Sequence, residues 1–391
     1  YTLYRSSAAS DVYKRQVHAG AGFAETARYI RLKKEDYPPE YEQALWGLYD
    51  VPAYARNLLR IPLVAYSGEN DKQIQAAQVM EEALAGHGRA LKHIIGPGMG
   101  HKYHPDSARK IEGIIASALL DGRDAHPVEV HLQSRTLRYQ RKHWVSITGL
   151  ERHWVDARVD AAIEGQRYEI KTVNVSGLSI NRSGDANGGT IDGQPFAPTE
   201  NAKHRLVKID GKWRVGEPEG TGKRPGLQGP IDDAFMSPFL VALPTGKAVS
   251  ERHQRWIDFE ISHFSKRWKE LMRGELRTKR EDQLTEADHR QFNIVAWGTA
   301  DSSPLVKSVM ARAPEHDRST QIVAMIQPNP NNPEKYLVIN SGLTFREAHD
   351  RTNSLQNPKL GDWAVIDLRR DPDAHAPGEV VSSGFFDESW R

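Results

Sequence analysis

Apolar and polar positions between residues 61 and 122 follow two alternating patterns. Leu63-Val-Ala-Tyr66 is a short continuous apolar run opened by Pro62, which predicts a parallel strand buried on both faces. A second strand is predicted at residues 91–95. Each strand is followed by apolar residues at three- and four-residue steps, which predict one buried face of a helix. These residues are Ile74, Ala77, Met80 and Leu84 after the first strand, and Ile111, Ile114, Ile115, Ala118 and Leu119 after the second.

Beyond a predicted linker at residues 121–127, the apolar period shortens to two residues, which is typical of strands with one solvated face. The clearest run consists of Val155, Ala157, Val159, Ala161 and Ile163. Asp210-Gly211 separates two further strand-like runs and predicts a hairpin. We expect a small antiparallel β domain over residues 127–228, with the glycine-rich stretch 183–193 as an exposed loop. Five aromatic residues form either a ligand platform or core, and core is the more usual environment: Tyr139, Trp144, Trp154, Tyr168 and Trp213.

From about residue 230 the pattern changes again, to strands that alternate with helices. Strands are predicted at 239–243, 293–297, 322–326, 336–339 and 364–368, and helices near 257–271, 305–312 and 344–352. Such alternation predicts a second α/β sheet, small and Rossmann-like or flavodoxin-like in outline. The stretches 298–303 and 340–342 each follow a strand, so they are either ligand loops or, as is more usual, ordinary turns. Asp232 and Asp233 are expected to make an interdomain contact rather than to take part in chemistry.

Composition excludes several classes of function. Among the 391 residues, 53 lysines and arginines nearly balance 51 aspartates and glutamates, so no excess positive field would attract nucleic acid or anionic membrane. The absence of cysteine removes disulfides, cysteine-ligated zinc and thiol catalysis together. No run of eighteen apolar residues occurs, so no transmembrane segment is predicted. No cofactor is predicted either, because residues 216–223 fail the P-loop glycine spacing and no dinucleotide-binding glycine motif follows a strand.

The candidate chemistry lies in the loops after the first two predicted strands, which carry Asp71 and His101. Loops at the carboxyl ends of neighbouring parallel strands share one crevice, so the two side chains can meet. A buried carboxylate there fixes the tautomer of a histidine, whose other nitrogen can accept a proton from a serine. His104 raises an alternative, a zinc site with Asp106 as an oxygen ligand, but Pro105 interrupts any single helical face and the paired acid and base already explain the loop.

These residues carry a resemblance to a known family. Residues 17 to about 122 resemble the carboxyl-terminal half of the catalytic domain of a prolyl oligopeptidase-family serine hydrolase. The matching segments are Gly20-Ala-Gly-Phe23, Pro62-Leu-Val-Ala-Tyr-Ser-Gly-Glu-Asn-Asp71 and Gly100-His101-Lys-Tyr103. The resemblance implies that Asp71 is the acid and His101 the base of a Ser-His-Asp triad. The family's serine, which sits in a Gly-x-Ser-x-Gly turn, and its oxyanion-hole donors match nothing in these 391 residues and are expected upstream of Val17.

The expected fold class is α/β: the carboxyl-terminal half of an α/β-hydrolase sheet at 17–122, the antiparallel β domain at 127–228 and the small Rossmann-like domain at 229–391. Residues 1–16 match no part of the resemblance and are expected to be a non-native leader. We hypothesise that a signal peptide preceded Val17, which would give a periplasmic or secreted protein. The expected activity is cleavage of a peptide or ester substrate, with this chain inactive alone. A carbohydrate (feruloyl or acetyl) esterase and a non-catalytic binding protein on a hydrolase scaffold are the alternatives.

Overall fold

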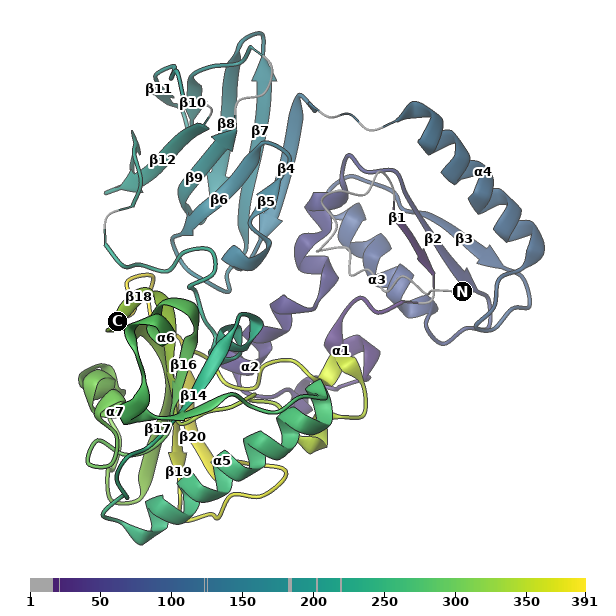
Figure 1. Cartoon of the computed structure of the whole chain (residues 1–391). Coiled ribbons are helices and arrows are strands. Elements are labelled where there is room, and N and C mark those ends of the chain that lie inside the picture. Colours follow the sequence, from purple (N-terminus) through teal and green to yellow (C-terminus); the bar gives the residue numbers. More distant parts are fainter. Residues whose placement is uncertain are drawn as a thin grey trace. The chain divides into compact units, whose positions relative to one another are not determined.

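The computed structural model describes residues 17–391 except 21, 123, 125, 182–184, 202 and 219, so the predicted leader lies outside the described residues. Over these residues the protein is mixed α/β, with four sheets (Figure 1). It divides into two compact units, each considered by itself. Unit 1 contains the described residues of 17–38 and 46–218, and unit 2 contains 39–45 and 220–391. The predicted linker at 121–127 therefore lies within unit 1. None of the helices in the described part is long and apolar enough to cross a membrane.

The first sheet of unit 1 has three parallel strands in the order β1-β2-β3. Its elements are β1 (Val17–Gly20), α1 (Thr26–Tyr29), β2 (Leu63–Gly68), α3 (Ile74–Ala85), β3 (Lys92–Gly96) and α4 (Pro105–Asp121). The predicted order of strand, helix, strand and helix is confirmed. Burial differs in detail from the expectation, because α3 buries Ala76, Val79 and Leu84, while Leu119 of α4 is about half exposed.

The second part of unit 1 is a β sandwich of two five-stranded sheets, with strand orders β11-β10-β8-β7-β4 and β13-β12-β9-β6-β5. The strands are β4 (Glu129–Ser134), β5 (Arg141–Lys142), β6 (Val145–Leu150), β7 (Ala157–Glu164), β8 (Arg167–Val173), β9 (Val175–Asn181), β10 (Gly189–Ile191), β11 (Gln194–Phe196), β12 (Lys203–Ile209) and β13 (Lys212–Val215). All pairs are antiparallel except β8 with β10. The predicted hairpin joins β12 to β13, with positive φ at both Asp210 and Gly211. Trp144, Trp154, Tyr168 and Trp213 are buried, as the core interpretation predicted, while Tyr139 is half-buried.

The expected exposed loop at 183–193 is wrong in its second half. Gly189–Ile191 is strand β10, and Ile191 is fully buried. A β-carbon on Gly189 would lie 1.9 Å from the carbonyl oxygen of Tyr168, so this glycine permits close approach of two backbones. Residues 183 and 184 lie outside the described residues.

Unit 2 is built on a seven-stranded sheet in the order β15-β14-β16-β18-β17-β19-β20. Its elements are α2 (Glu40–Leu45), β14 (Phe239–Leu243), α5 (Glu251–Met272), β15 (Thr278–Arg280), α6 (Glu286–Gln291), β16 (Asn293–Ala296), α7 (Pro304–Val309), β17 (Gln321–Asn329), β18 (Asn332–Ile339), β19 (Trp363–Asp367) and β20 (Glu379–Gly384). Strands β15, β14, β16 and β18 are parallel, while β17, β19 and β20 are antiparallel to their neighbours. The Rossmann-like expectation is therefore wrong for the part of the sheet formed by β17, β19 and β20. The turn between β17 and β18 is too short to hold a crossover helix, which parallel neighbours would need.

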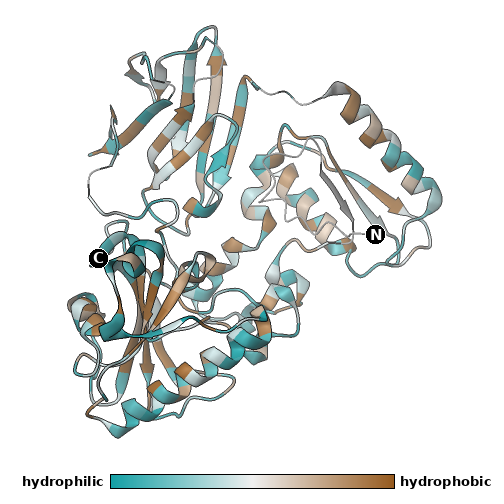
Figure 2. Cartoon of the chain, in the orientation of Figure 1, coloured by the Kyte–Doolittle hydropathy of each residue, from teal (hydrophilic) through white to brown (hydrophobic). Residues whose placement is uncertain are grey.

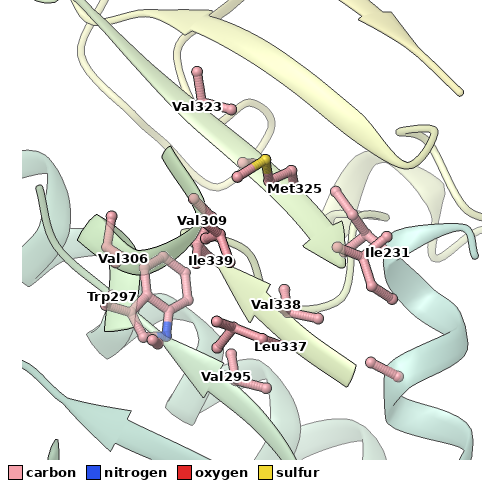
Figure 3. Packing of buried hydrophobic residues seen from close by; sticks show 14 of the residues in the cluster. Ile231, Val295, Trp297, Val306, Val309, Val323, Met325, Leu337, Val338 and Ile339 are labelled. Atoms are coloured by element: carbon pink, nitrogen blue, oxygen red, sulfur yellow. The ribbon is translucent and has the colours of Figure 1, made fainter. Parts of the chain in front are cut away.

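The core of unit 2 lies between this sheet and its helices. Figure 2 shows apolar residues along the central strands and mostly polar ones on α5, whose apolar residues form a stripe. Figure 3 shows Trp297, Val306 and Ile339 of this core, and all three are fully buried.

One further expectation for unit 2 is wrong. Residues 344–352 form only a three-residue 3-10 turn at Glu347–His349 rather than a helix. Asp232 and Asp233 bond within unit 2, because Asp232 accepts from Thr344 and Asp233 from the Tyr336 hydroxyl. These hydrogen bonds give both buried carboxylates partners within unit 2. The expected interdomain contact stays a prediction.

Candidate active site

Asp71 and His101 meet at the carboxyl edge of the three-stranded sheet. β2 and β3 are adjacent parallel strands that end at the paired residues Gly68 and Gly96, and each loop begins there. The distance from His101 Nδ1 to Asp71 Oδ2 is 3.1 Å. The Asp71 side chain is 6% exposed, whereas that of His101 is 67% exposed. The acid is thus enclosed by the protein while the imidazole faces solvent.

Backbone hydrogen bonds tie the two loops together. The Glu69 amide donates to the Gly96 carbonyl at 3.0 Å, and the Asn70 amide donates to the Met99 carbonyl at 2.8 Å. In the reverse direction, the Gly98 amide donates to the Glu69 carboxylate at 2.7 Å. The loop that carries the acid therefore holds the loop that carries the histidine in register, which limits the freedom of the pair before any substrate binds.

Gly68 allows the two loops to approach this closely. A β-carbon at residue 68 would lie 2.0 Å from the carbonyl oxygen of Gly100 and 2.5 Å from that of Met99. Both neighbours are backbone atoms, so no side-chain rotation could relieve the clash. A glycine at the end of β2 is thus a steric requirement of the loop that carries His101.

Tyr66, within β2, holds the loop that carries His101 through hydrogen bonds of its hydroxyl. Its hydroxyl donates to the Lys102 carbonyl at 2.8 Å and accepts from the His104 amide at 2.9 Å. The ring of Tyr103 stacks on that of Tyr66, with centroids 4.4 Å apart. The segment on both sides of His101 is therefore anchored to the sheet.

The hydrogen bonds of the Asp71 carboxylate define the state of His101. Asp71 Oδ1 accepts from the Gln73 amide at 2.9 Å, which leaves Oδ2 for the histidine. An ionised carboxylate only accepts, so His101 Nδ1 must carry the hydrogen. The neutral imidazole then has its lone pair on Nε2, the nitrogen that a general base requires.

His104 and Asp106, the residues of the zinc alternative, perform a structural task. His104 is the N-cap of α4, and its Nδ1 accepts from the Asp106 amide at 3.2 Å, while Pro105 takes the first helical position. Within the described residues, no three His, Cys, Asp or Glu side chains are grouped so that they could hold a metal ion.

A second serine-histidine-acid arrangement lies inside the same sheet and was not predicted from the sequence. His93 of β3 places Nε2 3.0 Å from Ser67 Oγ and Nδ1 3.2 Å from the Glu81 carboxylate. Ser67 is 1% exposed, so a carbonyl substrate cannot reach its hydroxyl. Ser67 is a polar residue in a mostly apolar strand, and nothing else in the sequence indicates that it contacts His93. We interpret this group as a buried polar network that stabilises the sheet.

The two candidate ligand loops of unit 2 bond to other parts of that unit. The Gly298 amide donates to the Asn340 side chain at 2.9 Å, and the same side chain donates to the Val323 carbonyl. The Thr299 amide donates to the Ser302 hydroxyl at 2.9 Å, and the Asn340 amide donates to the Ala296 carbonyl at 2.9 Å. Backbone and amide groups that an anion would need are already engaged, which favours the ordinary-turn alternative.

Comparison of the chain with protein-family models, with curated proteins and with solved structures finds no match.

Proposed function

We propose that the part of unit 1 within residues 17–122, which excludes residues 39–45, forms the acid- and base-bearing half of a serine hydrolase domain of the prolyl oligopeptidase type, which cleaves peptide or ester bonds. One observation carries the proposal. A buried carboxylate holds an exposed imidazole at the carboxyl ends of two adjacent parallel strands, with Asp71 preceding His101 in the chain. Acid before base is the order that α/β-hydrolases use.

In the proposed reaction, a serine hydroxyl adds to the substrate carbonyl carbon while Nε2 of His101 takes its proton. Asp71 stabilises the imidazolium through its bond to Nδ1. The Nε2 proton then passes to the departing amine or alcohol as the acyl bond to it breaks. A water molecule, deprotonated by the same nitrogen, releases the acyl group and regenerates the serine.

We infer that the serine belongs to a strand-turn-helix segment that pairs with the outer edge of β1. Among the described residues, β1 pairs only with β2, and a strand edge of a parallel sheet favours a further partner. A strand added there would end at the same carboxyl edge as the loops of Asp71 and His101. The 391 residues themselves contain no Gly-x-Ser-x-Gly turn.

Labelling with a fluorophosphonate, which reacts with activated serines, tests the proposal on the protein expressed from its complete native gene, where the inferred strand-turn-helix segment is to be sought. We expect one labelled serine in that segment. Labelling should be lost in His101→Ala and slowed on the order of 10⁴-fold in Asp71→Asn, which leaves the histidine in the wrong tautomer. The matched control is His104→Asn, three residues along the same loop, which retains a capping side chain.

Two results would contradict the proposal. Absence of any labelled serine would favour the binding protein on a hydrolase scaffold. Labelling that persists in His101→Ala but disappears in Ser67→Ala would assign the chemistry to the buried network of Ser67, His93 and Glu81. Residues 1–391 alone should remain unlabelled.

A further inference from the structure

A pocket of about 500 Å³ lies in unit 1, at the opposite edge of the three-stranded sheet from Asp71 and His101. Its walls come from the segment that leads into β2, the turn between α3 and β3, and strand β4. Leu59 and Ile61 contribute apolar surface, and four side chains that are or can become cationic contribute the rest: Arg60, His87, Arg89 and His131. This volume and this mixture of apolar and polar lining suit a small organic ligand.

Most of the charges around this pocket are compensated. Arg60 pairs with Glu129, and His131 contacts Asp160 at 2.6 Å. Asp160 also pairs with Arg56. Arg158 pairs with Asp156 at 2.5 Å. These three carboxylates and three arginines therefore balance.

Two cations are left without a carboxylate. The Arg89 guanidinium donates to the carbonyls of Leu58 and Ile61. Lys142 is 4% exposed, and its ammonium donates to the carbonyls of Asn57 at 2.7 Å and His131 at 3.1 Å. In the part of the chain that the structure describes, no acidic side chain lies within ion-pair distance of either one.

The two cations also act on each other. Burial, and to a smaller extent repulsion by Arg89, lowers the pKa of Lys142 to about 8. Burying an ammonium without a counter-charge is costly, and an anion bound in the pocket would lower that cost. His87 lies on the pocket wall, and no hydrogen bond engages its ring in the described residues. Its donor is available to such a ligand.

We propose that this pocket binds a small organic phosphate, whose dianionic group accepts from Arg89 and His87 while its organic part contacts Leu59 and Ile61. The two uncompensated positive charges match a dianion rather than a monocarboxylate. Lys142 does not line the pocket but bonds to the carbonyl of the lining residue His131. It therefore attracts the phosphate through its positive charge rather than through a direct contact. The site is independent of the proposed hydrolase activity, because it lies at the amino edge of β2 and β3 and shares no residue with the acid-base pair.

Calorimetric titration of the full chain with phenyl phosphate, inorganic phosphate and benzoate at constant ionic strength tests the proposal. Phenyl phosphate should bind saturably with a Kd of about 1 mM or tighter, inorganic phosphate more weakly and benzoate at least tenfold more weakly. His87→Gln and Arg89→Gln should each raise the Kd for phenyl phosphate at least tenfold. Arg109→Gln, which removes an exposed arginine of α4 that pairs with Asp106, is the control and should leave binding unchanged.

A second readout does not depend on how well the variants fold. Bound phosphate should raise the pKa of Lys142 by at least one unit in the unsubstituted chain, as followed by NMR of its side-chain ammonium. No saturable binding of phenyl phosphate, equal binding of benzoate, or an unchanged Lys142 titration in the presence of phenyl phosphate would each overturn the proposal.

Discussion

Replacement of Gly68 by alanine should displace the loop that carries His101. The added β-carbon would lie 2.0 Å from the Gly100 carbonyl oxygen, and ordinary contact begins near 3.4 Å, so this backbone would have to retreat by about 1.4 Å. Such overpacking typically costs about 1–3 kcal/mol. For a unit of this size, that predicts a fall in Tm of roughly 2–4 °C per kcal/mol. A shift of about 1 Å in a catalytic group can also lower a rate on the order of 10²-fold.

Gly100→Ala is the matched control, because a β-carbon at residue 100 meets nothing within 4 Å and its backbone does not require a positive φ. Thermal unfolding would give the stability of both variants. Hydrogen exchange at the Asn70 amide, which donates to the Met99 carbonyl, would report on the junction of the loops. If Gly68→Ala unfolds like the wild type with Asn70 equally protected, the steric reasoning is refuted.

Three further substitutions test other parts of the fold by urea unfolding. Lys223→Met should destabilise unit 2 by about 3–5 kcal/mol, because it leaves the fully buried Asp362 carboxylate without its ion-pair partner, and an effect below about 1 kcal/mol would contradict this. Burial raises the pKa of Asp232 to about 6 from 3.8, so this group should lower the stability of unit 2 by up to ~3 kcal/mol as pH rises from about 4 to about 6. Asp232→Asn should remove that slope, and an identical pH profile would count against it. Gly189→Ala should destabilise the sandwich by at least about 1–3 kcal/mol through its clash with the Tyr168 backbone, whereas wild-type stability would exclude the close approach of β8 and β10.

The direction of the pH effect follows from where the proton is held. The folded pKa of Asp232 lies above the unfolded value, so the folded state binds the proton more tightly and is favoured at the acidic end of this range. Desolvation is the largest cause, and the two hydrogen bonds from Thr344 oppose it only in part. Above about pH 6, both states are ionised and the contribution becomes constant.

The elements that hold the candidate site could be predicted because they depend on local pattern. The sequence contains two short apolar runs, each followed by the apolar stripe of a helix, and this pattern predicts two parallel strands whose loops share one edge of the sheet. Asp71 and His101, in those loops, do lie within hydrogen-bond distance. The proposed roles of the two residues rest on chain order and on the resemblance. Their contact also depends on close approach of the two loops, which Gly68 permits because it has no side chain.

Features that depend on distant contacts could not be predicted. The stretch 183–193 is rich in glycine, as loops often are, yet residues 189–191 within it form a strand, in which Gly189 fits against the Tyr168 backbone. The arrangement of Ser67, His93 and Glu81 joins two strands and a helix, and nothing in their spacing marks it. The strand order of the seven-stranded sheet likewise follows from which apolar faces pack together rather than from any single segment.

The pairing of Asp71 with His101 is tested most directly by the ¹⁵N chemical shifts of the His101 imidazole. For the neutral ring of the native chain, we predict that the hydrogen is on Nδ1 and that Nε2 is bare. Asp71→Asn should move the hydrogen to Nε2, because the asparagine amide can donate to Nδ1, while Asp106→Asn should leave the His101 shifts unchanged. A native ring with its hydrogen on Nε2, or no response to Asp71→Asn, would contradict the account.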